Sequence, residues 1–158
     1  FASLFVLFGD DGLGVGVDID IRPHNRDSIE SHKLASRIEL VEGSSIDAAT
    51  VESVRNIVGD RGPVIVNLDS MHTHDHVLEE LKLYSSFVPL GSYIVVSDTM
   101  IEEMPKGFYG DRPWDVGNNP KTAVYEILKD NSDFEIDKSI AGKLVATCNH
   151  DGYLKRVK

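Results

Sequence analysis

Residues 62–99 constrain the fold more than any other part of the sequence. They contain two runs of mainly branched apolar residues, 64–68 and 91–96, with an amphipathic helical pattern between them. Each run ends at an aspartate, Asp69 after the first and Asp98 just after the second. Runs of this kind are typical of parallel strands that are buried on both faces. The segment therefore predicts a strand, a helix and a strand of an α/β protein, in which ligands bind outside the carboxyl ends of the strands.

The rest of the chain continues this alternation. Strands are predicted at 15–20 and 37–41, and helices at 25–34, 48–58, 73–87 and from Pro120 onwards. In the helix 73–87 the apolar face is expected to be buried, whereas Glu79 and Glu80 are interpreted as solvated. Residues 134–140 and 144–148 predict a C-terminal antiparallel hairpin around Ala141 and Gly142.

Length and charge restrict the class of protein. A chain of 158 residues predicts a single domain, 1–158. The net charge of −10 argues against nucleic acid or an anionic membrane as a partner. Cys148 is the single cysteine, which excludes an internal disulfide and fits a cytoplasmic location. No apolar run is long enough to span a bilayer.

Asp69, His72 and Asp98 are predicted to converge at the carboxyl edge of the sheet. Carboxylates on neighbouring strand ends lie about 5 Å apart, and charges this close repel unless a proton or a cation lies between them. Mg²⁺ prefers such oxygen ligands and can lower the pKa of a bound hydroxyl, whose proton His72 could accept. Alternatively, Asp69 caps the next helix, Asp98 is a turn residue, and His72, with His74 and His76, is solvated.

Three further features are candidates for ligand binding. Asp18 ends a predicted strand, where one carboxylate can accept hydrogen bonds from both ribose hydroxyls of a nucleotide, or can instead cap the following turn. Ser44 and Ser45 follow another strand and could face a ligand, although serines are common in turns. The aromatic-containing loop 100–118 could form a substrate wall, or Trp114 could simply fix the loop to the body. The glycine-rich segment 9–16 is interpreted as a plain turn, because a strand follows it rather than a helix.

Several blocks resemble the cephalosporin hydroxylase / rhamnosyl O-methyltransferase family, and together they cover essentially the whole chain. The blocks are GVDIDIRPHN at 16–25, VEGSS at 41–45, NLDSMH at 67–72, GSYIVVSDT at 91–99, GFYG at 107–110 and DGYL at 151–154. The resemblance implies the class I S-adenosylmethionine-dependent methyltransferase fold, a doubly wound, mostly parallel, Rossmann-like sheet.

The resemblance also implies roles for individual residues. Asp18 looks like the ribose-binding acid, and the turn Gly43, Ser44 and Ser45 is implied to lie near the adenine. Asp69 and Asp98 look like ligands of a divalent metal, usually Mg²⁺, and His72 looks like the general base.

The sequence departs from the family pattern in two places. Ser97 occupies the position of a glutamate that often precedes the second aspartate, and serine is a poorer metal ligand. The family's first strand and glycine-rich loop should precede Phe1, and residues 1–8 match the helix that follows that loop. We therefore expect either that an upstream part of the chain exists or that another segment replaces the strand.

These observations predict an S-adenosylmethionine-dependent, divalent-metal-assisted O-methyltransferase. The expected acceptor is a hydroxyl of a sugar or another polar small molecule, such as a natural product, and the family implies a homo-oligomer. One alternative is a non-catalytic methyltransferase-like binding module, which would give no heat with S-adenosylmethionine. A third reading is a metal-dependent hydrolase, which would cleave esters without a methyl donor.

Overall fold

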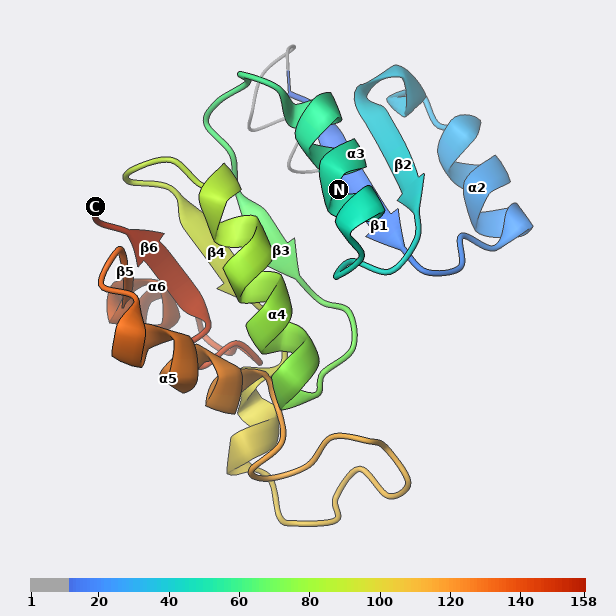
Figure 1. The fold of residues 1–158 in the computed structure, drawn as a ribbon. Helices are drawn as coiled ribbons and strands as arrows, with labels where there is room; N and C mark the ends of the chain where they lie inside the picture. The colour runs from blue at the N-terminus through green and yellow to red at the C-terminus, as the bar shows by residue number, and fades with distance from the viewer. Residues whose placement is uncertain (1–11) are drawn as a thin grey trace. The chain divides into compact units, whose positions relative to one another are not determined.

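The computed structural model describes residues 12–158, which form two compact units that meet between Asp60 and Arg61 (Figure 1). The helix expected at residues 1–8 lies outside the described part of the chain. The expectation of a single domain stays a prediction.

The first unit is a pair of parallel strands with helices beside it. Strand β1 (Gly14–Asp18) pairs with β2 (Ile38–Glu42) in a register that places Asp18 opposite Glu42. Helix α2 (Pro23–Glu30) and the short 3₁₀ helix η1 (Ala35–Arg37) connect the strands, and α3 (Ala48–Val58) follows β2. Val51 and Val54 are the buried valines of α3, as its apolar spacing predicts. The strands and helices predicted in this unit are present, but β1 ends at Asp18 rather than at residue 20, and α2 spans Pro23–Glu30 rather than 25–34. The side chain of Asp47 makes no capping hydrogen bond.

The second unit is built on a four-stranded mixed sheet in the order β3-β4-β6-β5. The strands are β3 (Val66–Leu68), β4 (Tyr93–Val96), β5 (Phe134–Ile136) and β6 (Tyr153–Arg156). Strands β3 and β4 are parallel, whereas β6 runs antiparallel to both of its neighbours. The helices are α4 (His74–Tyr84), η2 (Ser85–Phe87), η3 (Thr99–Glu103), α5 (Pro120–Asp130) and α6 (Lys138–Lys143). The prediction of an α/β fold with a strand–helix–strand unit is thus confirmed.

Helices α4 and α5 pack against each other and against one face of this sheet (Figure 1). The core between them consists of apolar side chains: Leu68, Val77, Leu78, Leu81, Val88, Ile94, Val96, Ala123, Val124, Phe134 and Leu154. Helix α5 begins where Asn119 and Pro120 predict it, with a capping box in which the Asn119 side chain accepts from the amide of Thr122. The apolar periodicity of both helices therefore fixes the face that they bury.

The predicted hairpin around Ala141 and Gly142 is wrong. Residues 138–143 form α6, which the Asp137 side chain caps by accepting a hydrogen bond from the amide of Ser139. The antiparallel partner of β5 is β6, for which the sequence patterns predict no strand. Leu154 in β6 is buried opposite Ile94, while Lys155 and Arg156 are only partly buried. Because two of its four residues are basic, the composition of this segment does not indicate a strand.

Within residues 12–158, β1 pairs with β2 in the sheet of the first unit, and β3 pairs with β4 in the sheet of the second unit. Strand β3 is less buried than its apolar sequence predicts, because Asn67 and the preceding Ile65 are exposed.

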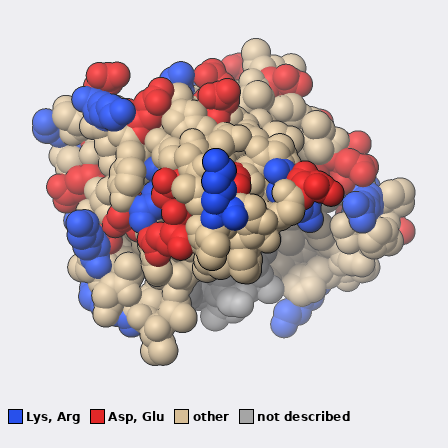
Figure 2. Space-filling view, turned by 90° about the horizontal axis from the view of Figure 1, so that it is seen from below, with Lys and Arg blue, Asp and Glu red and all other residues tan. Residues whose placement is uncertain are grey.

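Charged side chains of both signs lie on the surface (Figure 2), and one acid that the sequence predicts to be there is buried instead. Figure 2 shows basic and acidic side chains interspersed over one face, where their fields partly cancel. Glu80 was predicted to be solvated, and this is wrong, because its residue is only 2% exposed. No helix described within residues 12–158 has the length and apolar character needed to cross a membrane.

Candidate metal centre

Asp69, His72 and Asp98 come together at the carboxyl ends of β3 and β4. One donor atom from each lies within 4.8 Å of the other two. Nε2 of His72 is 2.7 Å from Oδ2 of Asp98 and 3.9 Å from Oδ1 of Asp69. The His72 side chain is 14% exposed, compared with 57% for Asp69, so the group is open to solvent on the Asp69 side.

The parallel register of β3 and β4 explains this convergence. Leu68 is aligned with Val96, so the residues that follow them leave the sheet at the same edge. Asp98 then adopts a left-handed conformation, with φ of 56°, which is uncommon for a residue other than glycine. The side chain of Asn149 supports it, because its Oδ1 accepts a hydrogen bond of 3.0 Å from the amide of Asp98.

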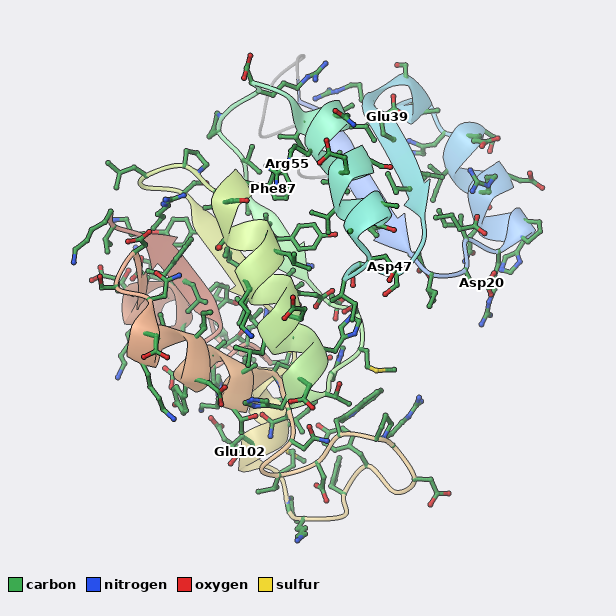
Figure 3. All side chains as sticks on the ribbon, viewed as in Figure 1. Asp20, Glu39, Asp47, Arg55, Phe87 and Glu102 are labelled. Carbon is green, nitrogen blue, oxygen red and sulfur yellow. The ribbon has the colours of Figure 1, made fainter. Side chains whose placement is uncertain are left out.

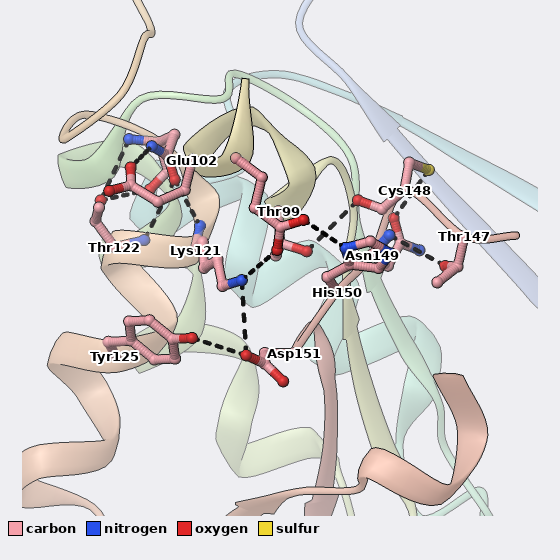
Figure 4. Close-up of polar contacts among 12 residues, drawn as sticks. Thr99, Glu102, Lys121, Thr122, Tyr125, Thr147, Cys148, Asn149, His150 and Asp151 are labelled. Atoms are coloured by element: carbon pink, nitrogen blue, oxygen red, sulfur yellow. Dashed lines mark hydrogen bonds and ion pairs between the residues drawn. The ribbon is translucent and has the colours of Figure 1, made fainter. Parts of the chain in front are cut away.

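A polar network anchors the turn that contains Asp98 (Figure 4). The amide of Met100 donates to the carbonyl of Cys148, next to Asn149. On the other side, the buried Lys121 of α5 lies 2.6 Å from a carboxylate oxygen of Glu103 and 3.6 Å from one of Asp151. These contacts join η3, α5 and the segment before β6 behind the candidate metal centre.

The same network gives the protein an acid-sensitive contact. Hydrogen bonds from Lys121, and then from His150, lower the pKa of Glu103 below its usual 4.5. A lowered pKa stabilises the folded state above the unfolded value, and that stability disappears as the pH falls through the folded pKa. We therefore expect Glu103→Gln to lower the urea midpoint near neutral pH and to show a smaller loss than the wild type between about pH 6 and about pH 3, the range that includes the unfolded pKa and extends below it.

The matched control for this measurement is Glu135→Gln, which removes one charge from an exposed position in β5. Its midpoint should follow the wild type at both pH values. An acid-induced loss in Glu103→Gln as large as in the wild type would contradict the contribution of the Lys121 contact.

Trp114 connects the long loop to this site. Its ring lies 5.0 Å from the ring of His72, centroid to centroid, and the Arg112 guanidinium lies 5.4 Å from the Trp114 ring. Glu102 fixes the loop by accepting hydrogen bonds from Gly117 and Asn119 (Figure 3 labels Glu102). Phe108 is 60% exposed. The two readings of Trp114 are therefore compatible, since the side chain both contacts the body and borders the site.

The other predicted ligand-binding residues lie in the first unit. Asp18 is exposed at the end of β1, and its Oδ1 accepts a hydrogen bond of 3.0 Å from the amide of Asp20, so it does cap the following turn. Its second carboxylate oxygen can still accept a hydrogen bond from a ligand. Gly43 packs against Thr50 so closely that a Cβ would collide with the hydroxyl of Thr50. Ser44 and Ser45 follow in the same turn and are partly buried, and the carbonyl of Ser44 accepts from the amide of Asp47.

The donor atoms of the candidate metal centre, formed by Asp69, His72 and Asp98, fit a hard divalent cation. Two carboxylates supply oxygen ligands, which Mg²⁺ prefers, and Asp69 and Asp98 are sufficiently exposed for water to complete the coordination. Without a cation, His72 is the nearest group that can offset the repulsion between the carboxylates. Ser97, in the position often held by a glutamate, donates a long hydrogen bond of 3.4 Å to Asn67.

Comparison with known proteins shows the family of this chain. The family model for rhamnosyl O-methyltransferase/CmcI matches residues 1–157. The chain belongs to this family. Rhamnosyl O-methyltransferases of Mycobacterium tuberculosis H37Rv and Mycobacterium bovis BCG are each 32% identical over 122 residues, which cover 74% of this chain and 46% of the relative. The chain thus spans about half the length of these family members.

A solved structure supports the fold. The methyltransferase MycE of mycinamycin biosynthesis, in complex with Mg and SAH, aligns with a TM-score of 0.53 at 20% identity, covering 93% of this chain and 37% of MycE. A second MycE complex, which also contains mycinamycin VI, aligns with a TM-score of 0.51. These alignments show that the mixed α/β arrangement resembles that of a methyltransferase.

Sequence reasoning missed two residues that support the site. Asn149 carries no local signal, because its contact with Asp98 depends on where β6 begins. Glu80 occupies the buried side of α4, and the spacing of three from Val77 could have indicated this.

Proposed function

We propose that the full-length protein is an S-adenosylmethionine-dependent, divalent-cation-assisted O-methyltransferase that acts on a hydroxyl of a sugar or another polar small molecule. Family membership supports the reaction class. The observation that carries the proposal is the convergence of Asp69, His72 and Asp98 within 4.8 Å at the carboxyl ends of two parallel strands.

Asp69 and Asp98 are the residues that would hold the cation. When bound, a cation such as Mg²⁺ lowers the pKa of an acceptor hydroxyl and orients it. The left-handed turn at Asp98, fixed by Asn149, keeps one of the two carboxylates in place before any ligand arrives. The exposed side of Asp69 leaves room for the acceptor.

His72 would accept the proton of the acceptor hydroxyl at Nε2, the nitrogen that faces both carboxylates. This nitrogen is within hydrogen-bond distance of Asp98, and while it carries a proton for that contact it cannot accept another. His72 can therefore act as a base only when Oδ2 of Asp98 has another partner. Trp114 limits rotation of the imidazole by packing against it.

The first unit would bind the methyl donor. Asp18 is proposed to bind the ribose, and Gly43, Ser44 and Ser45 to lie near the adenine, in the doubly wound, Rossmann-like arrangement of class I methyltransferases. The free oxygen of Asp18 and the close packing of Gly43 on Thr50 are compatible with these roles. We further propose that the full-length protein forms a homo-oligomer. We also propose that it does not bind nucleic acid, because the 158 residues of this chain carry a net charge of −10.

Sugars are the favoured acceptors for two reasons. The mycobacterial relatives are rhamnosyl O-methyltransferases. In this chain, Trp114 and the exposed Phe108 supply aromatic surface in the loop that borders the site.

The proposal is tested by methyl transfer from labelled S-adenosylmethionine to a rhamnoside acceptor, with the protein expressed from its complete open reading frame. Chelation by EDTA is expected to reduce transfer to background, and added Mg²⁺ to restore it, since the two carboxylates would again repel each other without the cation.

Two results would contradict this prediction. Absence of heat when S-adenosylmethionine is titrated into the folded full-length protein would favour a non-catalytic binding module. Metal-dependent ester cleavage without a methyl donor would favour a hydrolase.

A further inference from the structure

Glu80 is a buried acid near the candidate metal centre. It lies on α4 and is 2% exposed. Its Oε1 accepts a hydrogen bond of 2.7 Å from the hydroxyl of Ser70, and Nε2 of His76 lies 3.5 Å from the same oxygen. Within residues 12–158, its Oε2 is buried without a hydrogen-bond partner. A carboxylate in such surroundings requires an explanation, because most buried polar atoms have a partner.

Stability does not explain why this acid is buried. Removing a carboxylate from water is costly, and replacing a whole buried ion pair by apolar side chains of similar volume is often neutral or stabilising. Burial, and secondly the charge of Glu80, raise the pKa of Tyr84 to about 12.

The hydrogen-bond partner of Glu80 lies inside the candidate metal centre. Ser70 directly follows Asp69 and precedes His72 by two residues. Residues 69–73 belong to no helix or strand, so regular secondary structure does not fix their conformation. The hydroxyl of Ser70 ties this segment to α4, whose residues Val77, Leu78 and Leu81 are packed in the core.

We propose that Glu80 is a positioning residue for the metal centre, which holds the Asp69–His72 segment through Ser70. This inference rests on the proposed function, since it assumes that Asp69 and His72 act on a cation and an acceptor. Groups that orient metal ligands typically change metal affinity by about 10- to 100-fold when they are removed. A carboxylate kept only for stability would leave metal affinity unchanged.

Mn²⁺ alone serves as the probe, because oxygen sites that suit Mg²⁺ also bind it. Its affinity for the full-length protein is measured by calorimetry, and the urea midpoint of each variant is recorded in parallel. Ser70→Ala and Glu80→Leu are each expected to weaken Mn²⁺ binding roughly tenfold. The double variant should bind Mn²⁺ with the same affinity as either single variant, because both changes break the same contact. The urea midpoint of Glu80→Leu is expected to fall as well, because Ser70 and His76 lose their acceptor, so the Mn²⁺ affinity is the deciding measurement.

Glu80→Gln is the matched control, because its amide oxygen can still accept from Ser70, and it should bind Mn²⁺ like the wild type. Wild-type affinity in Ser70→Ala, an exposed position that should fold normally, would overturn the inference and leave the proposed function intact. A lowered midpoint of Glu80→Leu with unchanged Mn²⁺ affinity would also overturn it. A wild-type protein that does not bind Mn²⁺ would overturn the proposed function, and this inference with it.

Discussion

Replacement of Asp69 by asparagine is expected to abolish methyl transfer by the full-length protein while leaving it folded. Asparagine has nearly the same shape, but it lacks the negative charge that would bind the cation. The side chain of Asp69 is 57% exposed, and its recorded partner, His72, is 3.9 Å away, so the fold does not depend on it. Loss of one charged ligand should lower kcat/KM about a hundredfold or more, since a bound cation contributes several kcal/mol to the stabilisation of developing charge.

Asp75→Asn is the matched control for Asp69→Asn. Asp75 is an exposed acid in the first turn of α4, six residues along the chain, and its replacement removes the same charge. It should retain nearly full activity and bind Mn²⁺ as the wild type does. Unchanged turnover in Asp69→Asn would rule out a metal role for this carboxylate, whereas equal losses in both variants would indicate a non-specific effect of charge.

Sequence patterns were sufficient where local structure decides the outcome. The apolar spacing of α3 and the Asn119–Pro120 start of α5 specify those helices from a few residues. Asp69 and Asp98 could be placed together because parallel strands end at the same edge of a sheet, and each acid lies within two residues of the end of an apolar run. In the structure, one donor atom each of Asp69, His72 and Asp98 lies within 4.8 Å of the other two.

Sequence patterns failed to predict structure that depends on contacts between residues far apart in the chain. Strand β6 contains Lys155 and Arg156, and it becomes a strand because Leu154 fits between β4 and β5 in the core. Residues 144–148 look like a better strand, yet Leu144 and Val145 are exposed. The contact between Asn149 and Asp98 joins residues 51 apart in the chain, so neither residue alone indicates it.

Substitution of Gly152 by alanine is expected to destabilise the second unit strongly. Gly152 is buried, and its carbonyl accepts a hydrogen bond of 2.7 Å from the amide of Val96. An added Cβ would collide with the carbonyl oxygen of Val96 and lie 3.2 Å from Cγ2 of Thr99. The obstacle is the backbone of β4, which cannot move without breaking its ladder. We therefore expect a loss of about 1–3 kcal/mol or more in the free energy of unfolding, measured by urea denaturation.

Gly142→Ala separates this steric effect from the general effect of adding a methyl group. Gly142 lies in α6, and nothing is within 4 Å of an added Cβ there. Alanine should be neutral or stabilising at that position by up to about 1 kcal/mol, because it lowers the entropy of the unfolded chain. Gly152→Ala should also weaken Mn²⁺ binding, since a shift of β4 moves the turn that presents Asp98. Equal urea midpoints for the two variants would show that β4 and β6 do not approach each other as closely as this fold requires.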